Sequence, residues 1–382
     1  MRVLVLDTIH GGAELARALR GAGHDVDEVD VYRGQAGIPI EEALSRTYDL
    51  VTAPVHLDPD HPLLAAHGPA VSHHEVVKMV LDGGPLPHPF IEITGAQGKT
   101  TTAHALAALL PGAGILHTST GTYRYPEREL LWKKSITPAS LIPAVHEAAR
   151  IGGWLIAEES LGVAAAGDLA VLTSTEDYPI AARKKSALTE KCRLISRARA
   201  VVLPPGLDLP GAVATDSMVS FDGQVCRYSG NGSFENPLCT LPGYRTPLAL
   251  AVAAACMLGI DPSPLGEFAA LPGRMAARRE GGVLIVDNAN SGTNMATTIE
   301  AARYARELSG NAPLTLVIGE EARAICEGFS QNEILRTVST VAPAETVYVG
   351  EGHPAATLEA GLDAARAITP AGAIVLAVKT WR

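Results

Sequence analysis

Cysteine is scarce in this sequence and shows no arrangement that would build a site. The five cysteines, Cys192, Cys226, Cys239, Cys256 and Cys326, are scattered, with no CxxC pair and no histidine at metal-ligand spacing. This excludes a zinc finger or ribbon and a dense disulfide framework. We therefore expect most of these cysteines to be buried thiols in a reducing compartment, the cytoplasm.

Long apolar runs and an excess of positive charge are also missing. No stretch reaches the roughly 20 apolar residues that a membrane span requires, and the N-terminal MRVLVLDTIHGG predicts a buried first strand rather than a signal peptide. The formal net charge is −10 and the sequence pI is near 5.7. Broad binding to nucleic acid or to an anionic membrane needs a positive field, so we expect neither partner.

What is present is a regular alternation of strand and helix patterns. With 382 residues, 47% of them hydrophobic and 19% charged, the chain is typical of a globular protein of two or three domains. The β-α-β order favours parallel sheets with right-handed crossovers. The predicted strands are 2–7, 26–31, 48–53, 90–94, 113–117, 154–158, 169–173, 199–203, 283–287, 314–318, 346–349 and 373–378, and the main predicted helices are 13–22, 101–110 and 244–259.

The strongest local pattern is a glycine-rich turn between a strand and a helix, TGAQGKTT at 94–101. Backbone N–H groups of such a turn, together with the helix N-terminus, form a cradle for phosphate oxygens. Lys99 would neutralise the β- and γ-phosphates of ATP, and the Thr100 hydroxyl could bind Mg²⁺. The full P-loop pattern is absent because Ile93 stands five residues before Gly98. A chance Gly-Lys-Thr at a helix start therefore remains the alternative.

The shortened pattern G-x-x-G-K-T-T resembles that of the Mur ligases and folylpolyglutamate synthetases. The resemblance implies an ATP-dependent ligase with a three-domain α/β architecture, parallel and mixed sheets, and a central P-loop ATPase domain. It implies an N-terminal Rossmann-like substrate domain at 1–88, an ATP-binding domain at 89–270 and a closing C-terminal domain at 271–382. The implied ATP-binding loop comprises Gly95, Ala96, Gln97, Gly98, Lys99, Thr100 and Thr101.

Further segments extend the resemblance along the central domain. The segment SITP at 135–138 resembles a T-T-P motif, and AEES at 157–160 resembles E-x-S-S, whose first carboxylate holds Mg²⁺. This implies Glu158 as a metal ligand, with Glu159 the weaker candidate. Outside the resemblance, paired carboxylates at a strand end are usually solvated.

Two more positions bear on the predicted metal site. The segment TSTEDY at 173–178 resembles a family motif, but Tyr178 replaces its usual histidine. The segment EKCRLI at 190–195 is similar to the one in which many members carry a carbamylated lysine, which implies a second metal ligand at Lys191. Carbamylation needs the neutral amine, and burial or nearby cations favour that form. A solvated helix lysine is the alternative.

The third α/β unit also contains family-like motifs. LPGRM at 271–275 is similar to a hinge whose arginine reaches the nucleotide, which implies that role for Arg274. DNANS at 287–291 resembles D-Y-A-H-x. The resemblance implies that Asp287 pairs with the ribose and that Asn290 lies near adenine.

Candidate substrate-binding residues lie in three places. His10, Gly11 and Gly12 follow the first strand, where open α/β sheets bind ligands, although the glycines could serve only a tight turn. Two basic clusters could hold carboxylates, although charged runs are usually solvated faces: Arg124, Arg128, Lys133 and Lys134, and residues 183–185. The general base stays open among His10, His56, His73, His104 and His117.

Two segments of the N-terminal domain indicate which group of Mur-type ligases the chain most resembles. Residues 53–55 read APV where muramoyl-alanine-glutamate type ligases have S-P-G, and residues 7–12 read DTIHGG. These features and the compact length most resemble the Mur-ligase-like coenzyme F-430 synthetase family of methanogenic archaea. That resemblance implies a small-molecule carboxylate substrate, a nickel tetrapyrrole whose carbocyclic ring is closed at the expense of ATP. An amide-forming ligase with an amine acceptor and a non-catalytic nucleotide-binding regulator remain alternatives.

Overall fold

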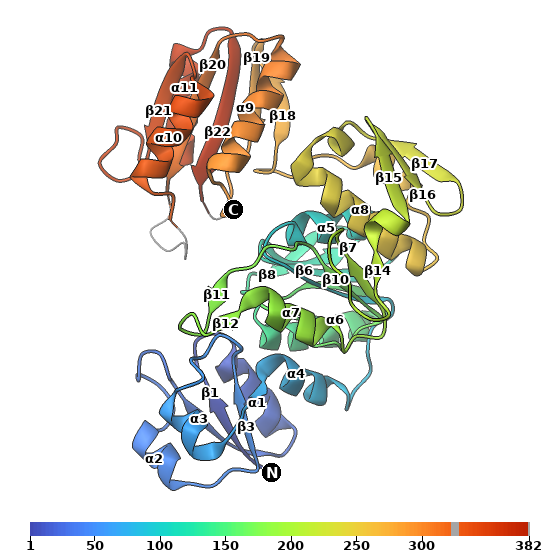
Figure 1. Cartoon of the computed structure of the whole chain (residues 1–382), viewed down its shortest axis with the longest axis vertical. Helices are drawn as coiled ribbons and strands as arrows, with labels where there is room; N and C mark the ends of the chain where they lie inside the picture. The colour runs from blue at the N-terminus through green and yellow to red at the C-terminus, as the bar shows by residue number, and fades with distance from the viewer. Residues whose placement is uncertain (322–327, 381–382) are drawn as a thin grey trace. The chain divides into compact units, whose positions relative to one another are not determined.

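The computed structural model describes residues 1–321 and 328–380 as two compact units, Met1–Phe268 and Ala269–Arg382. Figure 1 traces the order of the elements along the chain. No helix within the described ranges combines the length and the apolar character needed to cross a bilayer. The domain boundaries near residues 88 and 270 stay predictions.

A four-stranded parallel sheet, ordered β2-β1-β3-β4, opens the chain. Its elements are β1 (Arg2–Leu6), α1 (Gly12–Gly21), β2 (Asp25–Val29), α2 (Ile40–Ser45), β3 (Leu50–Ala53), α3 (Pro62–His67), β4 (Val71–Ser72) and α4 (His73–Leu81). Residues 3–6 are fully buried, as expected of a central parallel strand covered on both faces. Because β1 and β3 are parallel neighbours, the loops at their carboxyl ends lie side by side.

The second sheet has eight strands in the order β14-β13-β10-β5-β9-β6-β7-β8. Its elements are β5 (Phe90–Thr94), α5 (Lys99–Leu109), β6 (Gly114–Thr118), β7 (Gly121–Tyr125), β8 (Glu129–Trp132), α6 (Leu141–Ile151), β9 (Trp154–Glu158), β10 (Leu169–Leu172), β13 (Val201–Leu203) and β14 (Val213–Ala214). The five predicted strands here are confirmed. The antiparallel extension β7-β8 was not predicted. One apolar core joins the first two sheets, with Val3, Leu15, Ile115 and Val145 among its members.

Smaller elements complete the first unit. They are η1 (Pro138–Ser140), the hairpin β11 (Pro179–Ile180) and β12 (Lys185–Ser186), α7 (Ala187–Ile195), η2 (Thr215–Ser217), the antiparallel sheet β15 (Val219–Asp222), β16 (Val225–Tyr228) and β17 (Gly232–Glu235), η3 (Pro237–Thr240), α8 (Pro242–Met257) and η4 (Ser263–Glu267). Cys226 and Cys239 are buried thiols, whereas Cys192 and Cys256 are only partly buried. Cys326 lies outside the described residues.

The second unit is one five-stranded sheet, ordered β18-β19-β22-β20-β21, with β18 antiparallel to the rest. Its elements are β18 (Ala276–Glu280), β19 (Val283–Asp287), α9 (Met295–Ser309), β20 (Leu314–Glu320), α10 (Gln331–Val341), β21 (Glu345–Val349), α11 (Leu358–Ile368) and β22 (Gly372–Lys379). The four predicted strands of this unit are confirmed.

The start of α1 depends on a glycine. A Cβ atom at Gly12 would lie 1.7 Å from the carbonyl oxygen of Asp7, so a side chain there must displace the backbone. We expect Gly12→Ala to lower the free energy of unfolding by about 2–3 kcal/mol, as overpacking does. Urea denaturation measures this. The matched control is Gly21→Ala at the other end of α1, where no atom lies within 4 Å, and equal effects of the two substitutions would contradict the prediction.

Candidate active site

The glycine-rich loop, residues 95–98, lies at the carboxyl end of β5, between the ends of β9 and β10. Strand register pairs Ile93 with Glu158 on one side and Thr94 with Leu172 on the other. Gly95 and Gly98 have φ values of 152° and 84°. A Cβ on Gly95 would lie 2.1 Å from the Thr173 Oγ1 atom. The narrow turn therefore requires glycine at these positions.

Residues that follow β10 hold this loop in place. The Ala96 N–H donates to Ser174 Oγ at 2.9 Å, and Thr173 Oγ1 donates to the Gln97 carbonyl at 2.5 Å. The Gln97 side-chain amide donates to Glu176 at 2.6 Å. This bracing role of segment 173–176 was not predicted from the sequence. The available signal was a run of small hydroxyl residues directly after a strand that neighbours β5.

Lys99 and Thr100 begin α5 directly after the loop. No side chain caps the α5 N-terminus and no acidic residue occupies its first turn, so its N–H groups suit an anion. Lys99 Nζ donates to the Gly95 carbonyl at 2.9 Å, folding back over the loop. Thr100 Oγ1 lies 3.4 Å from Ser119 Oγ. This glycine cradle, with a lysine and a hydroxyl at its rim, fits the phosphates of ATP and a divalent metal.

The adjacent residues Glu158 and Glu159 have different surroundings. Glu158 ends β9 beside the loop and is 1% exposed. Glu159 and Glu92 are fully buried, and Glu159 accepts the Ala164 N–H at 3.1 Å while Glu92 accepts two backbone N–H bonds. Burial raises the pKa of both, and the Glu92 carboxylate raises that of Glu159 further. The Glu92–Glu159 pair therefore retains a proton, which leaves Glu158 as the better metal ligand of the two neighbours.

Lys191, on α7, is buried against Tyr178. Its Nζ lies 4.6 Å from the Tyr178 ring centroid and 3.5 Å from the hydroxyl. Burial, followed by the nearby charge of Lys99, lowers the Lys191 pKa to about 8. Lys191 is therefore not the solvated lysine of the alternative interpretation. Its role as a metal ligand stays a prediction.

The lowered pKa makes carbamylation of Lys191 testable. The neutral amine reacts with carbon dioxide, and its share rises as pH increases through about 8. We expect a carbamate signal in ¹³C NMR with labelled bicarbonate that is stronger at pH 9 than at pH 7. Lys191→Gln should lose the signal, whereas Lys78→Met should keep it. The same signal in Lys191→Gln would contradict the assignment.

No group of three His, Cys, Asp or Glu residues in the described ranges is preassembled to hold a metal. The metal-ligand roles of Thr100 and Glu158 stay predictions.

The loop after β1 is fixed by Asp7, whose carboxylate accepts the N–H groups of Ile9 and His10 at 2.7 and 2.8 Å. A Cβ on Gly11 would lie 2.5 Å from Thr137 Oγ1, so the loop packs on the predicted T-T-P-like segment. The sequence motifs at 7–12 and 135–138 therefore meet in space.

Four histidines line a pocket of about 220 Å³ beside this contact: His10, His56, His73 and His74. Burial lowers the pKa of His56 and His73 to about 4 and that of His74 to about 3. These three rings are thus uncharged at neutral pH. The structure brings three of the candidate bases together here, whereas buried His117 bonds Thr122 and Ser140.

The basic clusters are partly occupied by the protein's own carboxylates. Arg124 pairs with Glu129 and Glu147, and Lys134 pairs with Glu14. Lys133 is exposed. In the second cluster, Lys184 pairs with Asp58 and Asp60, whereas Lys185 lines a large pocket. The substrate roles of Arg124, Lys133 and Lys134 stay predictions.

In the second unit, the two family-like motifs lie together. Asn290 Nδ2 donates to the Gly273 carbonyl at 2.7 Å, joining the DNANS segment to the turn that contains Arg274. Asp287, at the end of β19, accepts the Ala289 N–H at 3.1 Å. The nucleotide contacts predicted for Arg274, Asp287 and Asn290 stay predictions.

Comparison with known proteins yields a sequence relative and a fold. Residues 277–380 match the family model described as Coenzyme F430 synthetase CfbE, C-terminal domain. The chain is 31% identical to the coenzyme F(430) synthetase of Methanosarcina acetivorans, covering 87% of this chain and 86% of that protein.

Solved structures share the architecture at lower identity. A pseudomurein peptide ligase type C from Methanothermus fervidus matches with a TM-score of 0.52 and 16% identity, over 99% of this chain and 97% of that one. A bifunctional folylpolyglutamate synthase/dihydrofolate synthase from Yersinia pestis matches with a TM-score of 0.55 and 16% identity, over 81% of this chain and 90% of that one. The Mur-ligase-like α/β fold predicted from the sequence is confirmed.

Proposed function

The chain belongs to the coenzyme F430 synthetase family, and we propose that it uses ATP to activate a propionate carboxylate of a nickel-containing seco-tetrapyrrole and then closes the carbocyclic ring. One observation supports the use of ATP in this proposal. The glycine loop and Glu158 lie at one edge of the central sheet, and Lys191 is near enough for the charge of Lys99 to lower its pKa. We assign the activity to the cytoplasm.

The first step transfers the γ-phosphoryl group to the substrate carboxylate. Because this brings anions together, cations and N–H dipoles must be preorganised around the phosphoryl group. The loop N–H groups hold the phosphates, and Lys99 exchanges its bond to the Gly95 carbonyl for phosphate oxygens. Thr100 and Glu158 would hold Mg²⁺, with Lys191 at a second metal position. The metal supplies charge neutralisation at the phosphoryl oxygens.

A solved structure of similar fold supports ATP and a divalent metal ion as ligands of this protein. The folylpolyglutamate synthase/dihydrofolate synthase structure from Yersinia pestis contains AMPPNP and a manganese ion. We propose Mg-ATP as the corresponding substrate here.

The second step forms a carbon–carbon bond. A general base takes a proton from a substrate carbon, the resulting enolate attacks the acyl carbon to form the new bond, and phosphate leaves as the acyl C–O bond breaks. Tethering the nucleophile to the electrophile supplies effective molarities that reach about 10⁵ M or more. The enzyme therefore needs no separate amine pocket, but it must keep water away from the acyl phosphate.

The test is incubation of the protein with Mg-ATP and the nickel seco-precursor in the absence of any amine. We expect ADP, phosphate and a product that has lost one water, with a shifted visible spectrum. Phosphate release that waits for an added amino acid would instead indicate an amide-forming ligase. Nucleotide binding without substrate-dependent phosphate release would indicate a regulator.

A further inference from the structure

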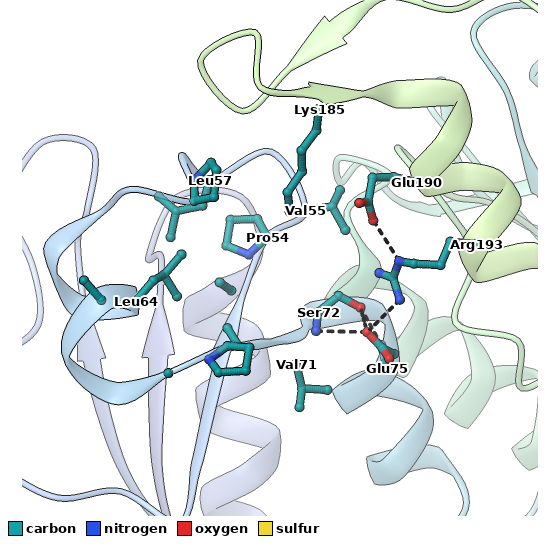
Figure 2. Close-up of a pocket in the computed structure, with 16 residues that line it drawn as sticks. Pro54, Val55, Leu57, Leu64, Val71, Ser72, Glu75, Lys185, Glu190 and Arg193 are labelled. Atoms are coloured by element: carbon teal, nitrogen blue, oxygen red, sulfur yellow. Dashed lines mark hydrogen bonds and ion pairs between the residues drawn. The ribbon is translucent and has the colours of Figure 1, made fainter.

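A large pocket lies in the first unit between the loop after β3 and helix α7, and we call it the β3–α7 pocket. Its volume is about 740 Å³, within the range of roughly 300–1,000 Å³ that is usual for small-molecule sites. Pro54, Val55, Leu57 and Leu64 form an apolar floor, and Lys185 and Arg193 stand on the opposite wall. Figure 2 shows Lys185 reaching from the β12 side towards Val55.

Apart from Lys185, each charged residue that lines this pocket has an ion-pair partner. Arg193 pairs with Glu190 at 2.9 Å and with Glu75 at 3.6 Å, and Arg197 also pairs with Glu75. Figure 2 shows the Arg193 guanidinium between Glu190 and Glu75. Within residues 1–321 and 328–380, the Lys185 ammonium has no ion-pair or hydrogen-bond partner. A ligand carboxylate would give it one.

On two sides, the β3–α7 pocket lies close to residues that we predict to act in phosphoryl transfer. Pro54 and Val55 also line the histidine pocket, whose wall includes Ser160, two residues beyond Glu158. Helix α7 contributes Glu190 and Arg193 to the β3–α7 pocket and carries Lys191 between them. A bulky ligand held here can therefore extend an arm towards the phosphoryl-transfer groups.

We propose that the β3–α7 pocket binds the apolar face of the tetrapyrrole macrocycle and that Lys185 pairs with one of its peripheral carboxylates. This inference rests on the proposed function. A broad carbon-rich ring with carboxylates at its rim matches an apolar floor with one unpartnered cation above it. An amino acid or simple amine would leave most of the floor in water. The neutral histidines next to the pocket cannot replace Lys185 as a charged anchor.

Two matched pairs of variants test the location. Ala65 is an exposed lining residue on α3, so Ala65→Trp should fill the pocket without disturbing the core, while exposed Ala66, which does not line it, provides Ala66→Trp as a control. Lys185→Met removes the anchoring charge and keeps an apolar stem. Lys78→Met removes an equal charge from a surface lysine of α4 that does not line the pocket.

The measurements are the Kd of the full-length protein for the nickel seco-precursor, followed by the precursor's visible absorption, and KM and kcat for ADP release. We expect Ala65→Trp and Lys185→Met to raise Kd and KM about tenfold or more, as loss of a desolvated contact does, with kcat for Lys185→Met nearly unchanged. The control variants should match wild type.

The outcomes separate the two proposals. Wild-type protein that binds and converts the precursor, with Ala65→Trp and Lys185→Met equal to their controls, would overturn the pocket assignment alone. Wild-type protein that neither binds nor converts the precursor would contradict the proposed function, and the pocket assignment would fall with it.

Discussion

Lys99→Ala is expected to lower substrate-dependent ADP release by about 10³-fold, the order found when a preorganised charge or donor at a transition state is removed. The loop keeps its shape without this side chain, since Gly95 and Gly98 set its backbone and Thr173 and Ser174 brace it. The substitution therefore removes positive charge at the γ-phosphate but leaves the cradle. A coupled ADP assay measures the loss, and circular dichroism with thermal unfolding reports the intact fold.

The control for this experiment is Lys78→Ala. Lys78 is a surface lysine on α4 that pairs with Asp82, and such pairs contribute little to stability. Its turnover should equal that of wild type. Near-normal turnover in Lys99→Ala would remove the basis for assigning phosphate binding to this loop.

The sheets could be predicted from the sequence because most of their strands are continuous apolar runs. Residues 283–286 are all buried, and a run of this kind between helical patterns is typical of a central parallel strand. The strand at 219–222 buries only its first residue, and the β11–β12 hairpin has two residues in each strand. Such short, half-exposed strands leave no pattern that distinguishes them from loops.

The site was only partly predictable for a different reason. The glycine loop is local in sequence, so its pattern alone indicated strand, turn and helix. The raised pKa of Glu159 depends on Glu92, which lies on a different strand. The pocket beside Lys185 depends on how α7 packs near the loop after β3. Neither arrangement is local in the sequence. Adjacent residues such as Lys184 and Lys185 have the same charge, yet only the structure shows that Lys184 is paired with Asp58 and Asp60.

Glu158→Gln is expected to lower turnover by about 10²–10³-fold, since an amide cannot supply the negative charge that a divalent metal requires beside ATP. A second readout is Mn²⁺ binding in the presence of a non-hydrolysable ATP analogue, followed by electron paramagnetic resonance. Affinity should fall with turnover, while binding of the nucleotide without metal stays close to wild type. The fold should survive, because glutamine has nearly the same size as Glu158 and keeps the backbone pairing at the end of β9.

The adjacent Glu159→Gln variant tests the same assignment in reverse. Burial and the Glu92 carboxylate raise the Glu159 pKa, which favours the uncharged form of its side chain. A glutamine can donate to Glu92 and still accept the Ala164 N–H that Glu159 accepts at 3.1 Å. Turnover and Mn²⁺ affinity should therefore stay near wild type, with a stability change within about 1 kcal/mol. If Glu159→Gln loses metal and Glu158→Gln keeps it, the metal ligand is Glu159, and the buried pair must be ionised rather than proton-sharing.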